Sequence, residues 1–570
     1  MENLNRHQKL GFCKNPKNFN LLFLILVFIL SFILFGNSIG GKFVGDDRHI
    51  VQERTDLKSL KNIPGLFASP AYPGQPWIGI YRPLTLISYA FNFAVSDKPA
   101  SFHVVNIILH ALNVFLIFLI TQRFASKKVA VISSLLFMFL PIHVEAVTSI
   151  VGRSEVLSIF FVLLSLFLFF KGKHIWASIA FLGALFSKDF SVFLLPLIGL
   201  LLLVETRSFW KSLKTGLYYL TPLPVYFALR YLALGKYILG GFRFNPVTAP
   251  LAFLGLKERI FTGFLSFFLY LRKTFYPVDL SPDYSFNQIP AVHNIFSSYQ
   301  AVLGLILLLG FVAVLIFGRK NLKIAAAILL VPFFFISNMI FVTSGSFAER
   351  WWYFPSFGLL VILALGLDKL IEEYGKIKTP ILVFLSVFLL WLSFLTIKQN
   401  RIWLNDRNFY VYAAKMSPNS AWTRSNLAAA YLNDGEYDKA KQEVQASLDI
   451  YGVYVPSLNM LGLLYWRDLD FKSAEGAFKK ALQFDLPGGN TRGLYRNLAF
   501  LNFDFGHSRQ ALEYMKKTVD APLVRGDTAA AEVDEMLYNI INANVGRELS
   551  SYSAKEKQKI GKLVRLVRGF

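Results

Sequence analysis

Cysteine is almost absent from this chain. Cys13 is the only cysteine among 570 residues, so the chain forms no internal disulfide and no metal site built from cysteines. His143 and Glu145 also lack the His-Glu-x-x-His spacing that places two histidines on one helix face, so a zinc site of that kind is not indicated.

Charged residues are few as well, and acidic ones are the scarcer kind. Only 17% of the residues are charged, whereas 54% are hydrophobic and 16% aromatic, and the mean hydropathy is +0.46. This composition excludes an ordinary soluble domain and indicates a polytopic membrane protein. The formal net charge is +23, but Lys and Arg flank the apolar runs, as orientation and lipid headgroup anchoring require. With no recognition motif visible, we expect membrane lipid and no nucleic acid among the partners.

Eleven apolar runs predict an all-α fold, a polytopic bundle of about eleven membrane spans. The first run, 21–35, is long for a signal-peptide core and lacks a cleavage site, so it is expected to stay in the protein. Several runs are shorter than the roughly 20 residues of a straight span, so those beside Lys188-Asp189 are expected to be tilted or broken. The runs lie at 20–39, 102–121, 129–141, 155–170, 175–187, 189–204, 215–234, 297–317, 324–343, 353–371 and 380–397.

Basic clusters set the orientation of these spans. Arg6, Lys9, Lys14 and Lys17 place the tail, residues 1–18, in the cytoplasm. With eleven spans, the clusters at 127–128, 171–173, 207–214 and 319–323 also lie inside, and the chain after residue 400 lies outside. The apolar segment 259–276 is interrupted by charged residues, so we expect a re-entrant or interfacial helix on the outer face.

A repeat appears after residue 400, where the composition becomes that of a soluble protein. Small and aromatic residues recur after 34 residues, which is typical of tetratricopeptide repeats, where small residues let two antiparallel helices approach closely. A third unit is displaced by an insertion around Pro487-Gly488-Gly489, and helical sequence from Asp527 onward is expected to cap the stack. The matched positions are Ala428, Tyr431 and Ala440, then Gly462, Tyr465, Ala474, Phe478 and Ala481, then Ala499, Ala511 and Met515.

Asp46 and Asp47 follow the first span within a few residues. Two adjacent carboxylates beside lipid are costly to desolvate, so they require a reason; a helix-terminus cap is the simpler alternative to catalysis. The predicted outer loops add four cations and three further polar candidates to this face. They are Arg82, Arg153, Lys188 and Arg350, with His103, His143 and Glu145. Arg350 has an alternative as a partner of Glu349.

These parts suit the transfer of a sugar from a lipid phosphate to a hydroxyl group. Phosphate is already a weak base, so its departure needs no general acid, unlike the leaving group in glycoside hydrolysis. One carboxylate suffices as general base, and cations hold the leaving phosphate. Direct displacement inverts the anomeric centre.

Motifs along the whole chain occur in an order that resembles one family. They include Phe-Val-Gly-Asp-Asp at 43–47, Tyr-Arg-Pro-Leu-Thr at 81–85, Phe-His-Val-Val-Asn at 102–106, Leu-His-Ala at 109–111, Pro-Ile-His-Val-Glu-Ala-Val at 141–147, Val-Gly-Arg-Ser-Glu at 151–155, Ser-Lys-Asp at 187–189, Asp-Leu-Ser-Pro-Asp-Tyr-Ser at 279–285 and Ala-Glu-Arg at 348–350. With the 34-residue repeats, this series resembles the transmembrane and tetratricopeptide repeat-containing (TMTC) O-mannosyltransferases and their prokaryotic relatives, which have the GT-C glycosyltransferase fold.

The resemblance implies a polyprenyl- or dolichyl-phosphate sugar donor and an extracytoplasmic acceptor. Its catalytic acid pair falls on Asp46 and Asp47, and its basic positions fall on Arg82, Arg153 and Lys188. We expect Asp47 to be the base, because it lies one residue further into the loop. Asp46 is the alternative base or the ligand of a divalent cation, Mg²⁺ or Mn²⁺. This chain departs from the family pattern in having Asp189 where Glu is common and only about three repeats.

The sequence therefore predicts a GT-C-like membrane domain over 19–400 and an extracytoplasmic repeat domain over 401–570. The predicted function is transfer of mannose or another hexose to an acceptor protein, on Ser or Thr, with the repeats recruiting the acceptor. A non-enzymatic membrane scaffold is the alternative, as is an acceptor that is glycan or lipid. A lipid-linked-sugar transporter is disfavoured, because few polar residues lie at mid-membrane. The scarcity of cysteine favours a prokaryotic cell membrane over the endoplasmic reticulum.

Overall fold

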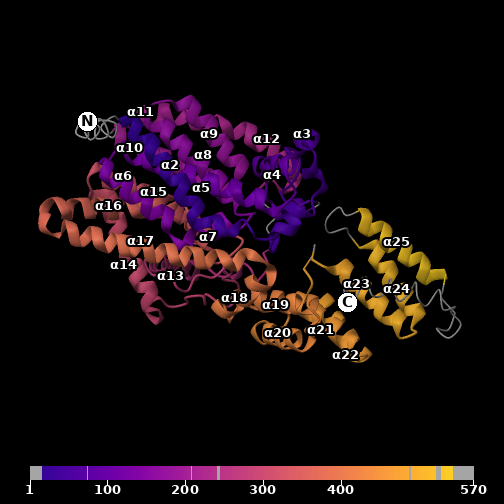
Figure 1. Cartoon of the computed structure of the whole chain (residues 1–570). Helices are drawn as coiled ribbons and strands as arrows, with labels where there is room; N and C mark the ends of the chain where they lie inside the picture. Colours follow the sequence, from indigo (N-terminus) through magenta and orange to yellow (C-terminus); the bar gives the residue numbers. More distant parts are fainter. Residues whose placement is uncertain are drawn as a thin grey trace, which may run out of the picture.

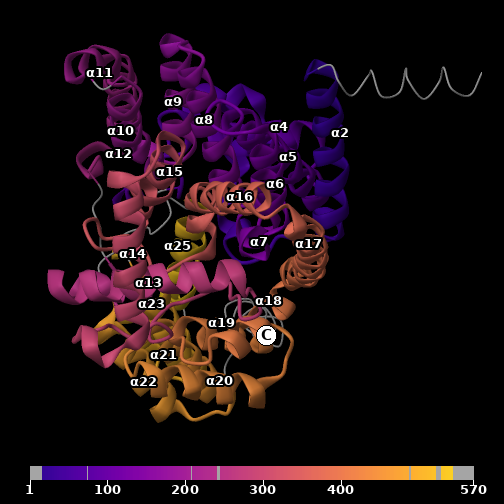
Figure 2. The same cartoon turned by 90° about the vertical axis from the view of Figure 1, so that its left-hand side faces the viewer.

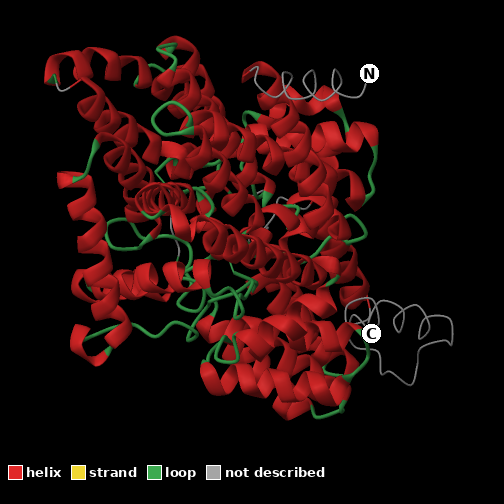
Figure 3. Ribbon diagram, turned by 60° about the vertical axis from the view of Figure 1, so that its left-hand side comes forward, coloured by secondary structure: helices red, strands yellow, loops and turns green. Residues whose placement is uncertain are grey.

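The structure is a computed structural model that describes residues 16–73, 75–206, 208–239, 244–486, 489–521 and 528–543. Helices and loops make up this described part, which contains no strand (Figure 3). The all-α prediction is confirmed. Of the basic tail, residues 1–15 lie outside the described residues, as do Pro487 and Gly488 of the expected insertion.

The membrane part packs around one extended apolar core. Val27, Ile117, Val162 and Ile328, from four different helices, are all at most 1% exposed. These side chains pack closely against one another inside the bundle, and this packing holds the helices together. Its helices are α2 (Pro16–Phe35), α3 (Ile63–Leu66), α4 (Pro83–Val95), α5 (Pro99–Thr121), α6 (Lys127–Phe139), α7 (Val144–Thr148), α8 (Arg153–Phe170), α9 (His174–Ser187), α10 (Leu194–Thr206), α11 (Phe209–Gly216), α12 (Pro222–Leu234), α13 (Leu256–Phe275), α14 (Tyr299–Phe317), α15 (Lys320–Ile336), α16 (Pro355–Glu373) and α17 (Lys378–Asn400).

Each of the eleven apolar runs overlaps a helix, but the count of eleven spans is not confirmed. Among the described residues, six helices are long and apolar enough to cross a membrane, or seven if α6 and α7, bent by 59° at Leu140, form one span. Several of the others, such as α9 and α12, have only 14 and 13 residues. The six candidates are Asn18–Ser38, Pro99–Thr121, Arg153–Phe170, Asp189–Thr206, Tyr299–Phe317 and Gly375–Leu404.

The expected irregular segments have distinct geometries. α9 ends at Ser187, Lys188 has extended backbone angles, and the 3₁₀ helix η7 (Asp189–Phe193) leads into α10, so the expected break is present. Segment 259–276 falls in α13, which is not among the candidate spans and lies crosswise to α14 (Figure 2). Charged residues stand in both of its end turns, Glu258 in the first and Lys273 in the last, so it is less apolar than a membrane span.

The C-terminal part is a row of antiparallel helix pairs that extends from one end of the membrane part (Figure 1). The predicted repeat positions fall where the paired helices touch. Ala428, Ala440 and Ala499 are fully buried, and a Cβ on Gly462 would lie 2.5 Å from the Phe478 ring, so this position needs a glycine unless the ring shifts. The helices are α18 (Asp406–Met416), α19 (Ala421–Asn433), α20 (Tyr437–Ile450), α21 (Val455–Arg467), α22 (Phe471–Phe484), α23 (Thr491–Asp504), α24 (Ser508–Asp520) and α25 (Thr528–Ala543).

One loop of the membrane part fastens this row of helices. Asp283 accepts hydrogen bonds from Ser420 Oγ at 2.6 Å and from Thr423 Oγ1 at 2.8 Å, both at the start of α19. The backbone adds a bond from Ala421 N to Phe286 O at 2.9 Å. The repeat helices are thus joined to the membrane part by polar contacts as well as by the covalent chain.

Candidate active site

The loop after α2 brings two neighbouring carboxylates into opposite environments. Gly45 has a positive φ of 55°, a conformation that glycine adopts readily, and turns the chain just before the pair. Asp46 is exposed, whereas Asp47 is only 1% exposed. Adjacent residues therefore have different chemistry, because one carboxylate meets solvent and the other meets the protein.

Asp47 is fixed by backbone donors on both of its oxygens. Val44 N–H donates to Oδ2 at 3.0 Å, and Val151 N–H donates to Oδ1 at 2.9 Å. Burial raises the pKa of Asp47 to about 7, although these two N–H groups act in the opposite direction. The carboxylate ties the α2 loop to the start of α8, which makes it a structural group. The expectation that Asp47 is the base finds no support in these contacts.

Gly152 explains how the start of α8 comes so close to Asp47. A Cβ at this position would lie 2.5 Å from the carbonyl oxygen of Ala146 and 2.9 Å from that of Glu145. A side chain would therefore push α7 away from the turn that carries the Val151 N–H group.

Two of the predicted cations are each paired with a buried acid. Lys188 pairs with Glu155, in the first turn of α8, and Arg350 pairs with Glu145 on α7. Arg350 N–H also donates to Glu145 Oε2 at 2.9 Å. The alternative pairing of Arg350 with Glu349 does not occur, because Glu349 faces the other way and accepts from Ser281 N–H at 2.7 Å.

Arg82 has a different place. It precedes α4, and its Nη1 donates to Ser154 Oγ at 3.2 Å, while its Nε is buried without a hydrogen-bond partner. No described carboxylate forms an ion pair with it. A buried N–H group left without an acceptor is costly, so this guanidinium is suited to an anionic ligand.

Several of these charged groups influence one another's pKa values. The pKa of Tyr72 is raised, first by burial and then by Asp46, whereas Arg82 and Arg350 lower it. Burial lowers the pKa of Arg350, but Glu145, Glu155 and Asp46 outweigh burial, and the net pKa is raised. Burial lowers the pKa of Lys188. Glu155 acts to raise it, and the positive charges of Arg82 and Arg350 lower it further. Arg82 and Arg350 thus act on Lys188, and Asp46 acts on Arg350; the roles expected of these four residues stay predictions.

Arg153 does not join this cluster as a free cation. It is 0% exposed, and every guanidinium nitrogen donates to protein: Nε to Asn106 Oδ1 at 2.8 Å, Nη1 to Asn92 Oδ1, and Nη2 to the Phe102 carbonyl at 2.7 Å. The ring of Tyr89 lies 4.9 Å from its guanidinium carbon. This geometry makes Arg153 a cross-link of α4, α5 and α8, and it gives no support to the phosphate-binding role expected of it.

The two histidine candidates are also internal. His103 is 2% exposed, and a Cβ added to Gly41 would lie 3.2 Å from its Nε2. His143 is fully buried; its Nδ1 donates to the Phe137 carbonyl at 2.9 Å, and its Nε2 lies 3.0 Å from Ser356 Oγ. Neither side chain is exposed to a substrate in this conformation.

The acids nearby do not form a metal centre. Within the described residues, no group of three or more His, Cys, Asp or Glu side chains is placed to hold an ion. Glu145 and Glu155 are paired with cations, and both oxygens of Asp47 accept N–H groups. A divalent cation would find one free carboxylate, that of Asp46, so the donor set does not fit a resident metal.

The first helix of the repeat part also reaches this loop, which sequence reasoning missed. Asp406, in the first turn of α18, accepts from Gly45 N–H at 3.0 Å and pairs with Arg48. The residues on either side of Asp46 and Asp47 are thus held by a carboxylate about 360 positions away. The only signal in the sequence is an acidic residue at the start of a helix, which is common.

Comparison with known proteins gives a consistent set of relatives. The chain is 26% identical over 471 residues to the human protein O-mannosyl-transferase TMTC3, covering 74% of this chain and 51% of that protein. It is 26% identical over 499 residues to human TMTC1, with 76% and 56% covered, and 24% identical over 432 residues to the Caenorhabditis elegans protein O-mannosyl-transferase F38B6.6, with 73% and 60% covered. The chain is TMTC-like.

Other comparisons add little to this result. The TMTC-like chain spans about half the length of the curated relatives it matches. No family model matches it. A chain of the solved APC/C hetero-tetramer Cut9-Hcn1 aligns at 11% identity, covering 85% of this chain and 90% of that chain. Its TM-score is 0.19, too low to indicate a shared fold.

The burial of Asp47 predicts a pH dependence of stability. Because its folded pKa of about 7 lies above the ordinary value of 3.8, the folded state keeps a proton that the unfolded state releases between these pH values. Stability from this group is present at low pH and is lost as pH rises toward 7, by roughly 1–4 kcal/mol. Thermal unfolding of the purified chain from pH 5 to 8 measures this effect, and Asp47→Asn should remove it.

Asp97→Asn is the matched control, because Asp97 is an exposed acid in the loop between α4 and α5. It should leave the pH profile of the wild type unchanged. A constant difference in melting temperature between wild type and Asp47→Asn at every pH would contradict the assignment.

Proposed function

We propose that this chain is a membrane glycosyltransferase that transfers mannose or another hexose from a polyprenyl- or dolichyl-phosphate donor to Ser or Thr of an extracytoplasmic protein. The observations that carry the proposal are the exposed carboxylate of Asp46, whose charge acts on Arg350, and the buried unpartnered N–H of Arg82. The names of the relatives, protein O-mannosyl-transferases, support the same chemistry.

In this mechanism Asp46, rather than Asp47, is the general base. Its carboxylate takes the proton of the acceptor hydroxyl as the oxygen attacks the anomeric carbon. The bond from that carbon to the phosphate oxygen breaks, and its electron pair leaves with the lipid phosphate. Attack opposite to the leaving group inverts the anomeric centre, and no metal ion takes part in these steps.

The cations have separate roles in the proposal. Arg82 has an unpartnered buried N–H and no ion pair with a described carboxylate, so it is the first choice to bind the donor phosphate. Lys188 and Arg350 are each paired with an acid, so Glu155 and Glu145 fix their positions and offset most of their charge. Arg350 reaches solvent, with 42% of its side chain exposed.

The repeat helices supply the acceptor in this proposal. α18 contacts the loop of Asp46 through Asp406, so a protein bound along the repeats is held close to the base. We place the protein in a prokaryotic cell membrane with the repeats outside; the endoplasmic reticulum with the repeats in the lumen is the alternative. Helices long enough to span a membrane support the integral placement.

The first test is sugar transfer by Asp46→Asn. Loss of a general base should lower transfer from a radiolabelled polyprenyl-phosphate sugar by about a hundredfold or more, with folding unchanged because Asp46 is exposed. Membranes containing equal amounts of each variant are compared, and Asp97→Asn should transfer like wild type. Equal transfer by Asp46→Asn would remove Asp46 from the mechanism. Absence of transfer by wild type, across several sugars and acceptors, would favour the scaffold.

A second test separates donor binding from base catalysis. Arg82→Gln should raise the KM for the lipid-phosphate donor by roughly tenfold or more, because a charge-assisted hydrogen bond to phosphate is lost. Lys98→Gln, which removes an exposed cation from the loop before α5, is the control. An unchanged donor KM in Arg82→Gln would assign the phosphate to other residues.

Asp406 offers a test of positioning. Asp406→Ala removes both contacts with the loop, so kcat should fall by roughly ten- to a hundredfold while the donor KM stays constant. Asp406→Asn keeps an acceptor for Gly45 N–H and should recover part of the rate. Asp434→Asn, in an exposed ion pair with Arg407, is the control. A change in donor KM with constant kcat would contradict a positioning role.

A further inference from the structure

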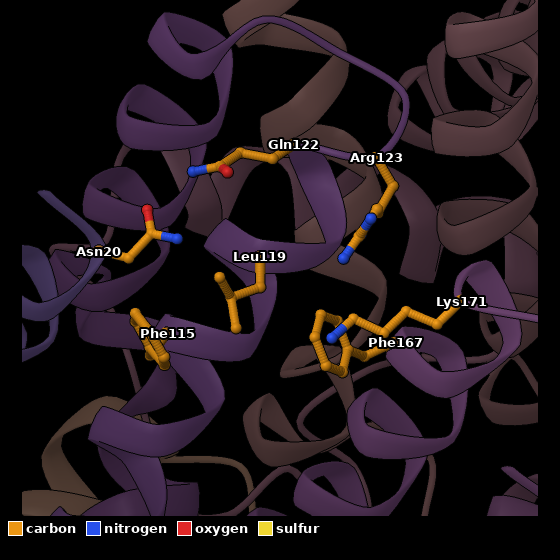
Figure 4. A pocket seen from close by; sticks show the side chains of 7 residues that line it. All are labelled: Asn20, Phe115, Leu119, Gln122, Arg123, Phe167 and Lys171. Carbon is orange, nitrogen blue, oxygen red and sulfur yellow. The ribbon is translucent and has the colours of Figure 1, made fainter. Parts of the chain in front are cut away.

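A pocket of about 420 Å³ lies between α2, α5 and α8, at the end of these helices far from Asp46 (Figure 4). Asn20, near the start of α2, lines it, whereas Asp46 follows the end of that helix. Arg123 follows the end of α5, and Lys171 follows the end of α8, whose first turn carries the Glu155 of the candidate active site. The pocket is therefore separate from that site.

Two cations share one aromatic ring in this pocket. The guanidinium carbon of Arg123 lies 5.6 Å from the centre of the Phe167 ring, and Lys171 Nζ lies 4.4 Å from the same centre. Figure 4 shows both side chains bending toward Phe167. Neither cation forms an ion pair with a described carboxylate. Both cations thus lie within 6 Å of one ring centre, and an anion bound beside that ring would offset the repulsion between them.

Two further polar side chains, those of Asn20 and Gln122, line the pocket on the side away from Arg123 and Lys171 (Figure 4). Gln122 Nε2 is buried and has no hydrogen-bond partner, so it is a further N–H donor at the pocket. Phe115 and Leu119 line the rest of the pocket (Figure 4), so an apolar chain attached to the anion would find contact there.

We propose that this pocket binds the phosphate group of an anionic membrane phospholipid. All three helices belong to the candidate spans, and their ends lie where lipid headgroups meet a protein. Basic pockets between membrane helices suit such headgroups, because Lys and Arg attract the negative charge of the phosphate. None of the residues proposed for catalysis lines this pocket, so lipid binding here does not depend on the proposed transfer reaction.

The test is lipid retention by the full chain in detergent, measured by native mass spectrometry. Wild type is expected to retain phosphatidylglycerol at least about tenfold more tightly than phosphatidylcholine. The double variant Arg123→Gln with Lys171→Gln should lose that preference, and Lys171→Gln alone should lose part of it. Lys211→Gln with Lys214→Gln, which removes two exposed cations of α11 at the same end of the molecule (Figure 2), should keep it.

Two results would overturn the proposal. One is equal retention of phosphatidylglycerol by wild type and the pocket double variant when both elute identically on size exclusion. The other is competition by inorganic phosphate: if it displaces the lipid or raises the melting temperature as much as phosphatidylglycerol does, the ligand is a free phosphate rather than a lipid headgroup. No displacement at millimolar inorganic phosphate would support the lipid assignment.

Discussion

The candidate active site depends on one buried carboxylate. Asp47 accepts N–H groups from its own loop and from Val151, and so joins the end of α2 to the start of α8. Because both of its oxygens are engaged, Asp47 holds the loop in one conformation. Asp47 points into the protein, and its neighbour Asp46 is exposed to solvent. The division of labour within the pair follows from this anchor.

The cations of the site follow a second constraint, the cost of burying charge. Glu155 and Glu145 neutralise Lys188 and Arg350, and a buried pair of this kind costs several kcal/mol to break by removing one partner. These pairs give the site a rigid frame. Of the three, Arg82 is the one with a buried side-chain donor that has no acceptor among the described residues. The candidate site thus contains two cations fixed by acids and one with an unpartnered buried donor.

The repeat helices are part of this arrangement. Asp406 holds the loop of Asp46 from outside the membrane part, and Asp283 holds the start of α19 from within it. The membrane part and the repeat helices, which meet after Asn400, are thus joined by two polar contacts, with one carboxylate from each part. The start of the repeat helices is therefore held against the membrane part at two places.

The sequence by itself determined the helical elements, and it indicated candidate residues for the site, whose roles stay predictions. Apolar runs and small-residue spacing are local properties, so the helices and the paired repeats could be predicted, and charges in loops on one side were expected to meet. The number of spans could not, because a run such as α9 does not reveal whether 14 residues cross a membrane. Only the tertiary structure decided which member of each similar pair is buried or saturated with partners. Asp47 rather than Asp46 is buried, and Arg153 rather than Arg82 is saturated with acceptors, because partners come from segments 47 to 104 residues away. Local sequence carries no record of such contacts, since burial and hydrogen bonding are set by packing between distant helices.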